Sequence, residues 1–213
     1  MTRPFASPFD DVPVFPLPET VLFPDARMPL HVFEPRYRAM LADCLESGGA
    51  IVIASVNRSG SIAKIAGLGM IVEHRSLPDG RSNIVVMGAE RVRLDELVPE
   101  EPPRYPYKRA RITRLGQLDV TVSAADRTAL LATATMFASE VRKHDPSFVL
   151  RMQADAPAGA IADACAFQLV VDPGLKQSLL EELDPRVRVR IVMDQLAIQH
   201  GAMQGDSRAK VLH

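Results

Sequence analysis

The sequence predicts an α+β protein with a strand-rich first half and a helical second half. Two apolar segments interrupted by proline open the chain, and the Leu77-Pro-Asp-Gly80 segment, between two apolar stretches, is typical of a hairpin turn. After residue 118 the apolar residues recur with a helical period, and three Asp-Pro pairs divide the remainder. We therefore expect a β-rich lobe, residues 1–118, followed by a helical lobe, residues 119–213.

The opening segments, residues 12–17 and 21–24, predict short strands. Their prolines cannot donate to a sheet ladder, so edges or bulges of a small barrel are favoured over a flat central sheet. A helix is expected from Pro35, because proline suits the first helical turn, and Gly48-Gly49 should end it. The expected buried face of this helix comprises Tyr37, Met40, Leu41, Cys44 and Leu45.

The rest of the first half predicts a sheet. Residues 50–56 are apolar on both faces, as in an interior strand. The hairpin supplies strands at 68–76 and 82–87, and two further strands are expected at 92–98 and 107–115.

The second half predicts a set of helices. Ser123 and Asp126 have the spacing of a capping box, with Asp in place of the usual Glu. Each Asp-Pro pair can place Asp at an N-cap and Pro in the first turn. The three pairs are Asp145-Pro146, Asp172-Pro173 and Asp184-Pro185, and the later helices are expected at residues 160–171, 175–183 and 187–200.

The composition is that of an ordinary globular protein. Of the 213 residues, 47% are hydrophobic and 24% are charged, and the net charge of −1 favours no class of charged partner. Apolar runs such as Ala50–Val56 are far shorter than the ~20 residues that a bilayer requires, so no membrane association is expected. Cys44 and Cys165 form no CxxC motif, and we expect buried thiols in a reducing cytoplasm.

Several short motifs follow one another along residues 11–200. They are Phe15-Pro-Leu17, Leu22-Phe-Pro24, Pro29–Arg38, Gly69–Glu73, Pro78–Arg81, Asn83–Val86, Gly88–Arg91 and Leu179–Asp184. Their order and spacing resemble the N-terminal substrate-binding domain of the ATP-dependent Lon proteases, in its free-standing form without ATPase or peptidase domains. The resemblance implies a PUA-like β pseudo-barrel followed by a C-terminal helical bundle, the two lobes together forming one unit.

The resemblance implies binding rather than catalysis. The sequence contains no GxxxxGK[ST] loop for ATP, and the Ser-Lys pair of the Lon peptidase belongs to a domain that the resemblance does not cover. No clustered Cys, His or Asp spacing suggests a metal, so we expect no catalytic residues and no cofactor. An unrecognised hydrolase stays open as an alternative, because His31 and Glu34 are close enough in sequence to share a hydrogen bond.

The expected partner is a polypeptide substrate or another protein, bound in an apolar groove without ATP. Strands interrupted by proline have poorly paired edges that can accept an extended peptide. The resemblance implies that unfolded or flexible segments are recognised, in proteolysis or quality control. The candidate binding residues are Phe15, Leu17, Phe23, Met28, Phe33, Arg36 and Tyr37.

A basic segment, residues 104–114, indicates a different function. Its cations are interleaved with tyrosines, and PUA-like barrels include RNA binders. The same pattern also fits an edge strand that carries charge on its solvent side, and the acidic residues 96–101 would offset its field. RNA binding is therefore the alternative function, with candidate residues Arg104, Lys108, Arg109 and Arg111.

Overall fold

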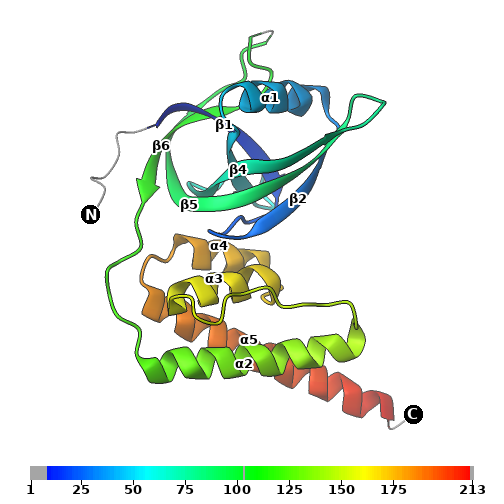
Figure 1. Ribbon diagram of the computed structural model, residues 1–213, viewed down its shortest axis with the longest axis vertical. Coiled ribbons are helices and arrows are strands. Elements are labelled where there is room, and N and C mark those ends of the chain that lie inside the picture. The colour runs from blue at the N-terminus through cyan, green and yellow to red at the C-terminus, as the bar shows by residue number, and fades with distance from the viewer. Residues whose placement is uncertain (1–8, 103, 212–213) are drawn as a thin grey trace. The chain divides into compact units, whose positions relative to one another are not determined.

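The computed structural model describes residues 9–102 and 104–211 (Figure 1). The chain divides into two compact units, Met1–Gly116 and Gln117–His213, where the sequence predicted a boundary after residue 118. Within the described ranges, the first unit contains six strands and one helix, and the second contains four helices. The predicted α+β class, with a β-rich part followed by a helical part, is confirmed.

The first unit is a pseudo-barrel. Its elements are β1 (Phe9–Pro18), β2 (Arg27–Val32), α1 (Pro35–Glu46), β3 (Ala50–Val56), β4 (Ile65–Ser76), β5 (Ser82–Val98) and β6 (Arg109–Leu115). The sheet order is β2-β5-β4-β3-β1-β6, and a further pairing between β5 and β6 closes five of the strands into a ring. Among the strand pairings of the described residues, only that of β1 with β3 is parallel.

Strand β5 connects the closed part of the sheet to an open part. Its first residues, Ser82–Met87, pair with β2, and its last residues, Arg91–Val98, pair with β6. Strand β4 pairs with β5 along almost the whole length. The separate strands predicted at 82–87 and 92–98 are therefore one strand of 17 residues, which passes through Gly88 without a turn.

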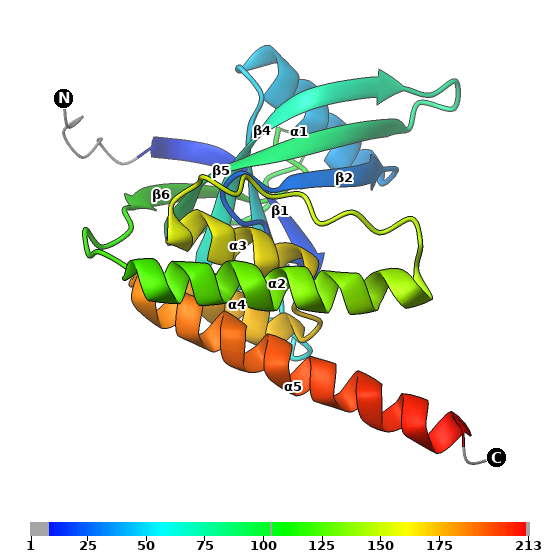
Figure 2. The same cartoon turned by 60° about the horizontal axis from the view of Figure 1, so that its bottom comes forward.

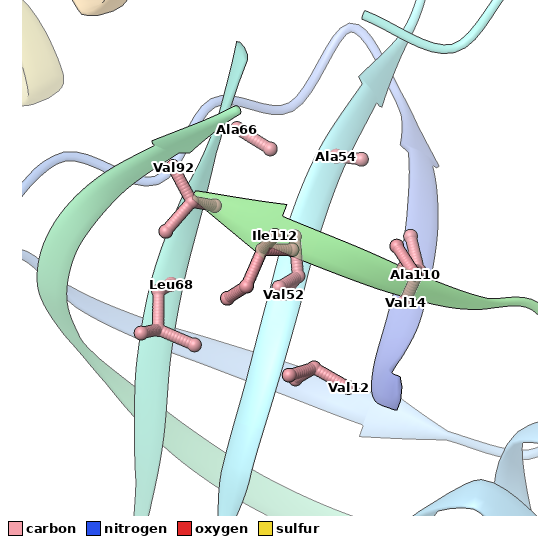
Figure 3. Close-up of a cluster of buried hydrophobic side chains, with 9 residues drawn as sticks. All are labelled: Val12, Val14, Val52, Ala54, Ala66, Leu68, Val92, Ala110 and Ile112. Carbon is pink, nitrogen blue, oxygen red and sulfur yellow. The ribbon is translucent and has the colours of Figure 1, made fainter. Parts of the chain in front are cut away.

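The interior of the barrel is filled by small and β-branched side chains. Every second residue of a strand points to the same face, so β1, β3, β4 and β6 each contribute two residues spaced by two, and β5 contributes Val92 (Figure 3). The cluster comprises Val12, Val14, Val52, Ala54, Ala66, Leu68, Val92, Ala110 and Ile112. Strand β2 contributes no residue to this cluster, which places it outside the closed ring.

The prolines of β1 lie where the strand has a partner on one side. Val12 and Pro13 pair with β6, whereas Val14–Pro18 pair with β3, and a register shift precedes Val12. Pro16 and Pro18 pair with β3 and not with β6, so their missing N–H groups do not interrupt hydrogen bonding on two sides. This is the placement expected for proline at edges and bulges.

The strand predicted at residues 21–24 is wrong. Residues 20–26 form no strand, yet Val21, Leu22 and Phe23 are buried. This connection crosses β4 and β5 at glycines: a Cβ on Gly67 would lie 2.2 Å from the carbonyl oxygen of Leu22, and a Cβ on Gly88 would lie 1.9 Å from that of Phe23. The apolar run is therefore a connection that packs directly on the backbone of β4 and β5.

Helix α1 begins at Pro35 as predicted and buries Tyr37, Met40, Leu41 and Cys44. Leu45, the fifth residue of the predicted stripe, is 40% exposed, so that part of the prediction is wrong. The last turn of the helix instead lines a groove against the β4–β5 hairpin. Gly48 and Gly49 end the helix with φ angles of 94° and 84°, which side chains other than glycine rarely adopt.

The second unit contains α2 (Ala124–His144), α3 (Ala158–Gln168), α4 (Pro173–Glu181) and α5 (Pro185–Val211) (Figure 2). Helix α5 packs against both α2 and α3. Three caps follow the predictions: the backbone N–H groups of Asp126, Leu175 and Arg186 donate to the side chains of Ser123, Asp172 and Asp184, respectively.

The first Asp-Pro pair, Asp145-Pro146, does not start a helix. Asp145 is the C-cap of α2, and its carboxylate accepts bonds from the backbone N–H and the hydroxyl of Ser147 at 3.0 and 2.6 Å. The helix start predicted there is wrong, because the carboxylate closes a local turn instead.

A buried ion pair lies inside the helical unit. Arg188 Nε is 3.0 Å from Asp163 Oδ1, and the two side chains are 1% and 5% exposed. The Arg188 guanidinium also donates to the side chain of Gln117 and to the carbonyl of Glu182. One side chain therefore ties α5 to α3, to the end of α4 and to the first residue of the unit. None of the helices in the described ranges is both long enough and apolar enough to cross a membrane.

Candidate functional site

Strands β2, β5 and β4 form a three-stranded layer beside the closed ring (Figure 1). Directly paired residues point to the same face of a sheet, so the register defines which side chains lie together. On one face, the Arg27 side chain forms an ion pair with Glu73, and His31 Nδ1 lies 2.7 Å from Asn83 Oδ1. We call this the β2–β5–β4 face; it comprises Arg27, Pro29, His31, Met70, Glu73, Arg75, Asn83, Val85 and Met87.

Apolar side chains interrupt the polar pairs on this face. Met70 is 38% exposed and is paired with the half-buried Met87. Val72, the extra residue of a bulge, is 46% exposed. Phe33 directly follows β2, is 58% exposed, and stacks on the His31 ring with 6.0 Å between centroids. The layer therefore presents large apolar side chains to solvent.

One edge of the layer is open. Strand β2 pairs with β5 on one side and has no strand partner on its other side within the described residues. Pro29 in β2 lacks an N–H group, which limits how long a ladder could form there. The β2 edge can therefore accept a short extended segment by main-chain hydrogen bonds.

Most of the seven predicted binding residues lie in the interior. Phe15, Phe23, Met28 and Tyr37 are buried, and Leu17 and Arg36 are half-buried. The rings of Phe15 and Tyr37 pack with centroids 4.5 Å apart, and the Arg36 guanidinium lies 4.5 Å above the Tyr37 ring. These contacts hold α1 on the barrel, and Phe33 alone of the seven is largely exposed.

Sequence reasoning missed the apolar residues of β4 and β5 on this face. Residues 70–72 and 84–87 are continuous apolar runs, and a strand that is apolar on both faces needs a cover on each. Helix α1 lines the opposite side of this hairpin, whereas Met70 and Val72 stay exposed. The unbroken apolar run was therefore the available signal.

The basic strand carries most of its charge in ion pairs. Arg109 pairs with Asp11, Arg111 with Glu96 at 3.2 Å, and Lys108 with Glu100 at 4.0 Å. Arg104 is exposed, and its guanidinium lies 5.1 Å from the centre of the Tyr105 ring. Carboxylates thus offset the positive field of three of the four candidate RNA-binding residues.

Arg109 belongs to a polar network rather than to the open surface. Its guanidinium donates to the hydroxyl of Tyr107 at 2.9 Å, and that hydroxyl donates to Asp43 of α1. Burial and the bond to Asp43 both raise the pKa of Tyr107, so the phenol stays protonated and keeps donating. This network joins β6 to α1.

The alternative catalytic pair is not assembled. His31 contacts Asn83, and Glu34 instead forms an ion pair with Arg36 at 3.0 Å. Burial raises the pKa of both thiols, Cys44 and Cys165, to about 12, which keeps them protonated and poorly nucleophilic. Within the described residues, no three His, Cys, Asp or Glu side chains converge in a way that would hold a metal ion.

The fold defines a class of protein: an α+β domain made of a β pseudo-barrel and a helical unit. A family model described as "ATP-dependent protease La (LON) substrate-binding domain" matches residues 11–197. The chain belongs to this family.

Curated relatives are longer proteins. The chain is 28% identical over 189 residues to a Lon protease of Roseiflexus castenholzii, an alignment that covers 85% of this chain and 23% of the relative. It is 26% identical over 200 residues to a Lon protease of Trichlorobacter lovleyi, with 89% and 24% covered. The chain thus spans about a quarter of the length of these relatives.

Solved structures share the fold. A Lon N-terminal domain protein from Xanthomonas campestris superposes with a TM-score of 0.68 at 21% identity, covering 87% of this chain and 98% of that one. The N-terminal domain of a Mycobacterium avium complex Lon protease gives a TM-score of 0.65 at 18% identity, with 88% and 98% covered. The pseudo-barrel and helical arrangement is therefore common to these domains.

Proposed function

We propose that this chain binds extended apolar segments of polypeptides on the β2–β5–β4 face and does not itself perform catalysis. The observation that carries the proposal is the open β2 edge beside the exposed side chains of Phe33, Met70 and Val72. The family's description as a substrate-binding domain supports the same role.

The chemistry of the face fits a varied set of segments. A segment added at the β2 edge would bind through its main chain, which is present in every sequence. Side chains two residues apart in the segment project to one face at intervals of about 6.8 Å. Met70 and Met87 are flexible and adapt to side chains of different shapes.

The relatives support a biological setting for this binding. They are named as proteases, and this chain matches about a quarter of their length. We infer that it holds unfolded or flexible polypeptides for proteolysis or quality control, in a reducing cytoplasm where its two free cysteines stay reduced.

The experiment is a binding titration with a labelled, uncharged, end-blocked peptide in which leucine alternates with glutamine. Met70→Ser should weaken binding about fivefold, because it removes roughly 1 kcal/mol of apolar contact. Leu97→Ser is the matched control, since Leu97 on β5 is also 38% exposed but pairs with β6. Equal losses in the two variants, or no binding at all, would contradict the proposal.

A second titration with single-stranded RNA separates the alternative function. RNA binding through the basic strand would weaken steeply with salt and be lost in Lys108→Glu or Arg111→Glu. Binding of the uncharged peptide should change little with salt, because it involves no charge pairing.

A further inference from the structure

A groove of about 520 Å³ lies between α1 and the β4–β5 hairpin. Its lining includes Arg38, Ala42 and Leu45 from α1, and His74 and Ser82 from the hairpin. The sheet register places Arg75 and Asn83 on the β2–β5–β4 face, so the neighbouring residues His74 and Ser82 belong to the opposite face. The groove is therefore separate from the proposed apolar binding surface.

The α1 wall combines one cation with apolar surface. Arg38, Ala42 and Leu45 are spaced by four and three residues, so they form one stripe along the helix. Leu45 is the residue that the helical pattern predicted to be buried and that the structure leaves 40% exposed. The hairpin wall is polar: His74 Nε2 lies 3.1 Å from Ser82 Oγ.

The charge of the groove is not balanced. None of its lining residues is acidic, and no carboxylate among the described residues lies within ion-pair distance of Arg38. Neighbouring arginines differ, because Arg36 pairs with Glu34 and Arg81 pairs with Asp79. The Arg38 guanidinium also lies against the hairpin turn, where a Cβ on Gly80 would be 2.3 Å from Nη2.

We propose that this groove binds an extended acidic polypeptide segment in which a carboxylate side chain lies two residues from a leucine-sized side chain. In an extended chain, such side chains are about 6.8 Å apart on one face. One turn of helix rises 5.4 Å, so a carboxylate at Arg38 places the apolar side chain over Ala42 and Leu45. Ser76, Ser82 and His74 supply hydrogen-bonding groups to the main chain of the segment.

This inference depends on the proposed function in one respect only, namely that the bound molecule is a polypeptide. It assigns a second surface with its own selectivity: the β2–β5–β4 face selects apolar side chains, and the groove selects an acidic residue beside an apolar one.

The test uses labelled, end-blocked seven-residue peptides in which Glu and Leu are two residues apart and the other residues are serine. The Glu peptide should bind about fivefold more tightly than its Gln counterpart, the upper end of what an exposed charge pair supplies. Arg38→Gln should abolish this preference, and added salt should reduce it. Moving Leu next to Glu should also weaken binding, because adjacent side chains point to opposite faces.

Arg75→Gln is the matched control. It also removes one positive charge, from the hairpin that lines the groove, but Arg75 pairs with Asn83 on the other face, so the preference for Glu should survive. Equal affinity for the Glu and Gln peptides, or equal effects of Arg38→Gln and Arg75→Gln, would overturn the inference. Far-UV circular dichroism checks that each variant is folded, as expected for exposed arginines.

The two proposals fail separately. If the uncharged leucine–glutamine peptide binds and responds to Met70→Ser while no preference for Glu is seen, only the groove inference falls. If the Glu preference depends on Arg38 while the uncharged peptide does not bind, the proposal for the β2–β5–β4 face falls.

Discussion

Arg109 in the barrel unit and Arg188 in the helical unit each pair with an aspartate, but the two ion pairs differ in depth. Arg109 of β6 has a side chain that is 13% exposed, and its partner Asp11 is 49% exposed. Arg188 of α5 and its partner Asp163 are almost completely buried. Water still screens the first pair, whereas the second depends on its protein partners alone.

The close contacts of the two units also differ in kind. In the barrel unit, the backbone of residues 22–23 lies directly on Gly67 and Gly88, with no room for a side chain between them. In the helical unit, a buried charge and side-chain caps at Ser123, Asp172 and Asp184 fix where helices begin and meet. The restraint at Gly67 and Gly88 is therefore steric, whereas the one at Arg188 and Asp163 is electrostatic, so the two should respond to different perturbations.

The three tyrosines allow the units to be followed separately. Tyr37, Tyr105 and Tyr107 all belong to the barrel unit, and the chain has no tryptophan. Near-ultraviolet absorption and fluorescence therefore report on the barrel. Circular dichroism at 222 nm is dominated by the helical unit, which contains four of the five helices.

The largest effect is expected from Arg188→Met. This variant leaves Asp163 buried without its cation, which costs about 3–5 kcal/mol for a buried pair. The midpoint of urea unfolding should fall when it is followed by circular dichroism at 222 nm, and it should stay unchanged when it is followed by tyrosine fluorescence. The double variant Asp163→Leu with Arg188→Met should recover much of the loss, and a single variant that costs less than about 1 kcal/mol would break the comparison.

A smaller effect, in the barrel unit instead of the helical unit, is expected from Gly88→Ala. The added methyl would meet the carbonyl of Phe23, which is backbone and cannot rotate away. Overpacking of this kind costs about 1–3 kcal/mol, and the tyrosine transition should report it. Gly201→Ala is the control: nothing lies within 4 Å of its Cβ position, and the change should stabilise α5 by about 0.5–1 kcal/mol.

The smallest effect concerns acid. The hydrogen bond from Arg186 lowers the pKa of Asp184 from 3.8 to about 2. Because the folded pKa lies below the unfolded one, this carboxylate stabilises the helical unit above about pH 4, and the contribution is lost as the pH falls through 2.

Asp184→Asn isolates that contribution. The melting temperature followed at 222 nm should fall by less between pH 4 and pH 2 in the variant than in the parent chain. Asp79→Asn serves as the counterpart in the barrel unit, where the bond from Arg81 lowers the pKa of Asp79. An equal change of the 222 nm signal in both variants would show that the acid response is not specific to the helical unit.

Local signals predicted much of the fold because local physics determines it. The capping residues Ser123, Asp172 and Asp184 bond to backbone two or three residues away, so the sequence contains the whole interaction. Asp145-Pro146 shares its dipeptide with two of them but closes a turn on Ser147, which the dipeptide alone does not specify.

The other errors concern interactions between distant segments. The connection at Val21–Phe23 has the composition of a strand. It packs as a connection because glycines of β4 and β5, more than 40 residues away in the sequence, leave room for its backbone. Burial of Phe15, Phe23, Met28 and Tyr37 likewise depends on strands and a helix distant in sequence. An apolar pattern shows that a side chain tends to be buried, but it does not show which element buries it.

Strand β5 also has a mechanical consequence. A polypeptide attached to β2 and pulled along the strand direction would load the β2–β5 pairing in shear, across all six residue pairs at once. Strand β5 continues without a break into its pairing with β6, so the load would pass into the wall of the barrel. Because Pro29 limits the ladder at the other edge of β2, a tethered chain held by fewer than six residue pairs would detach before β2 separates from β5.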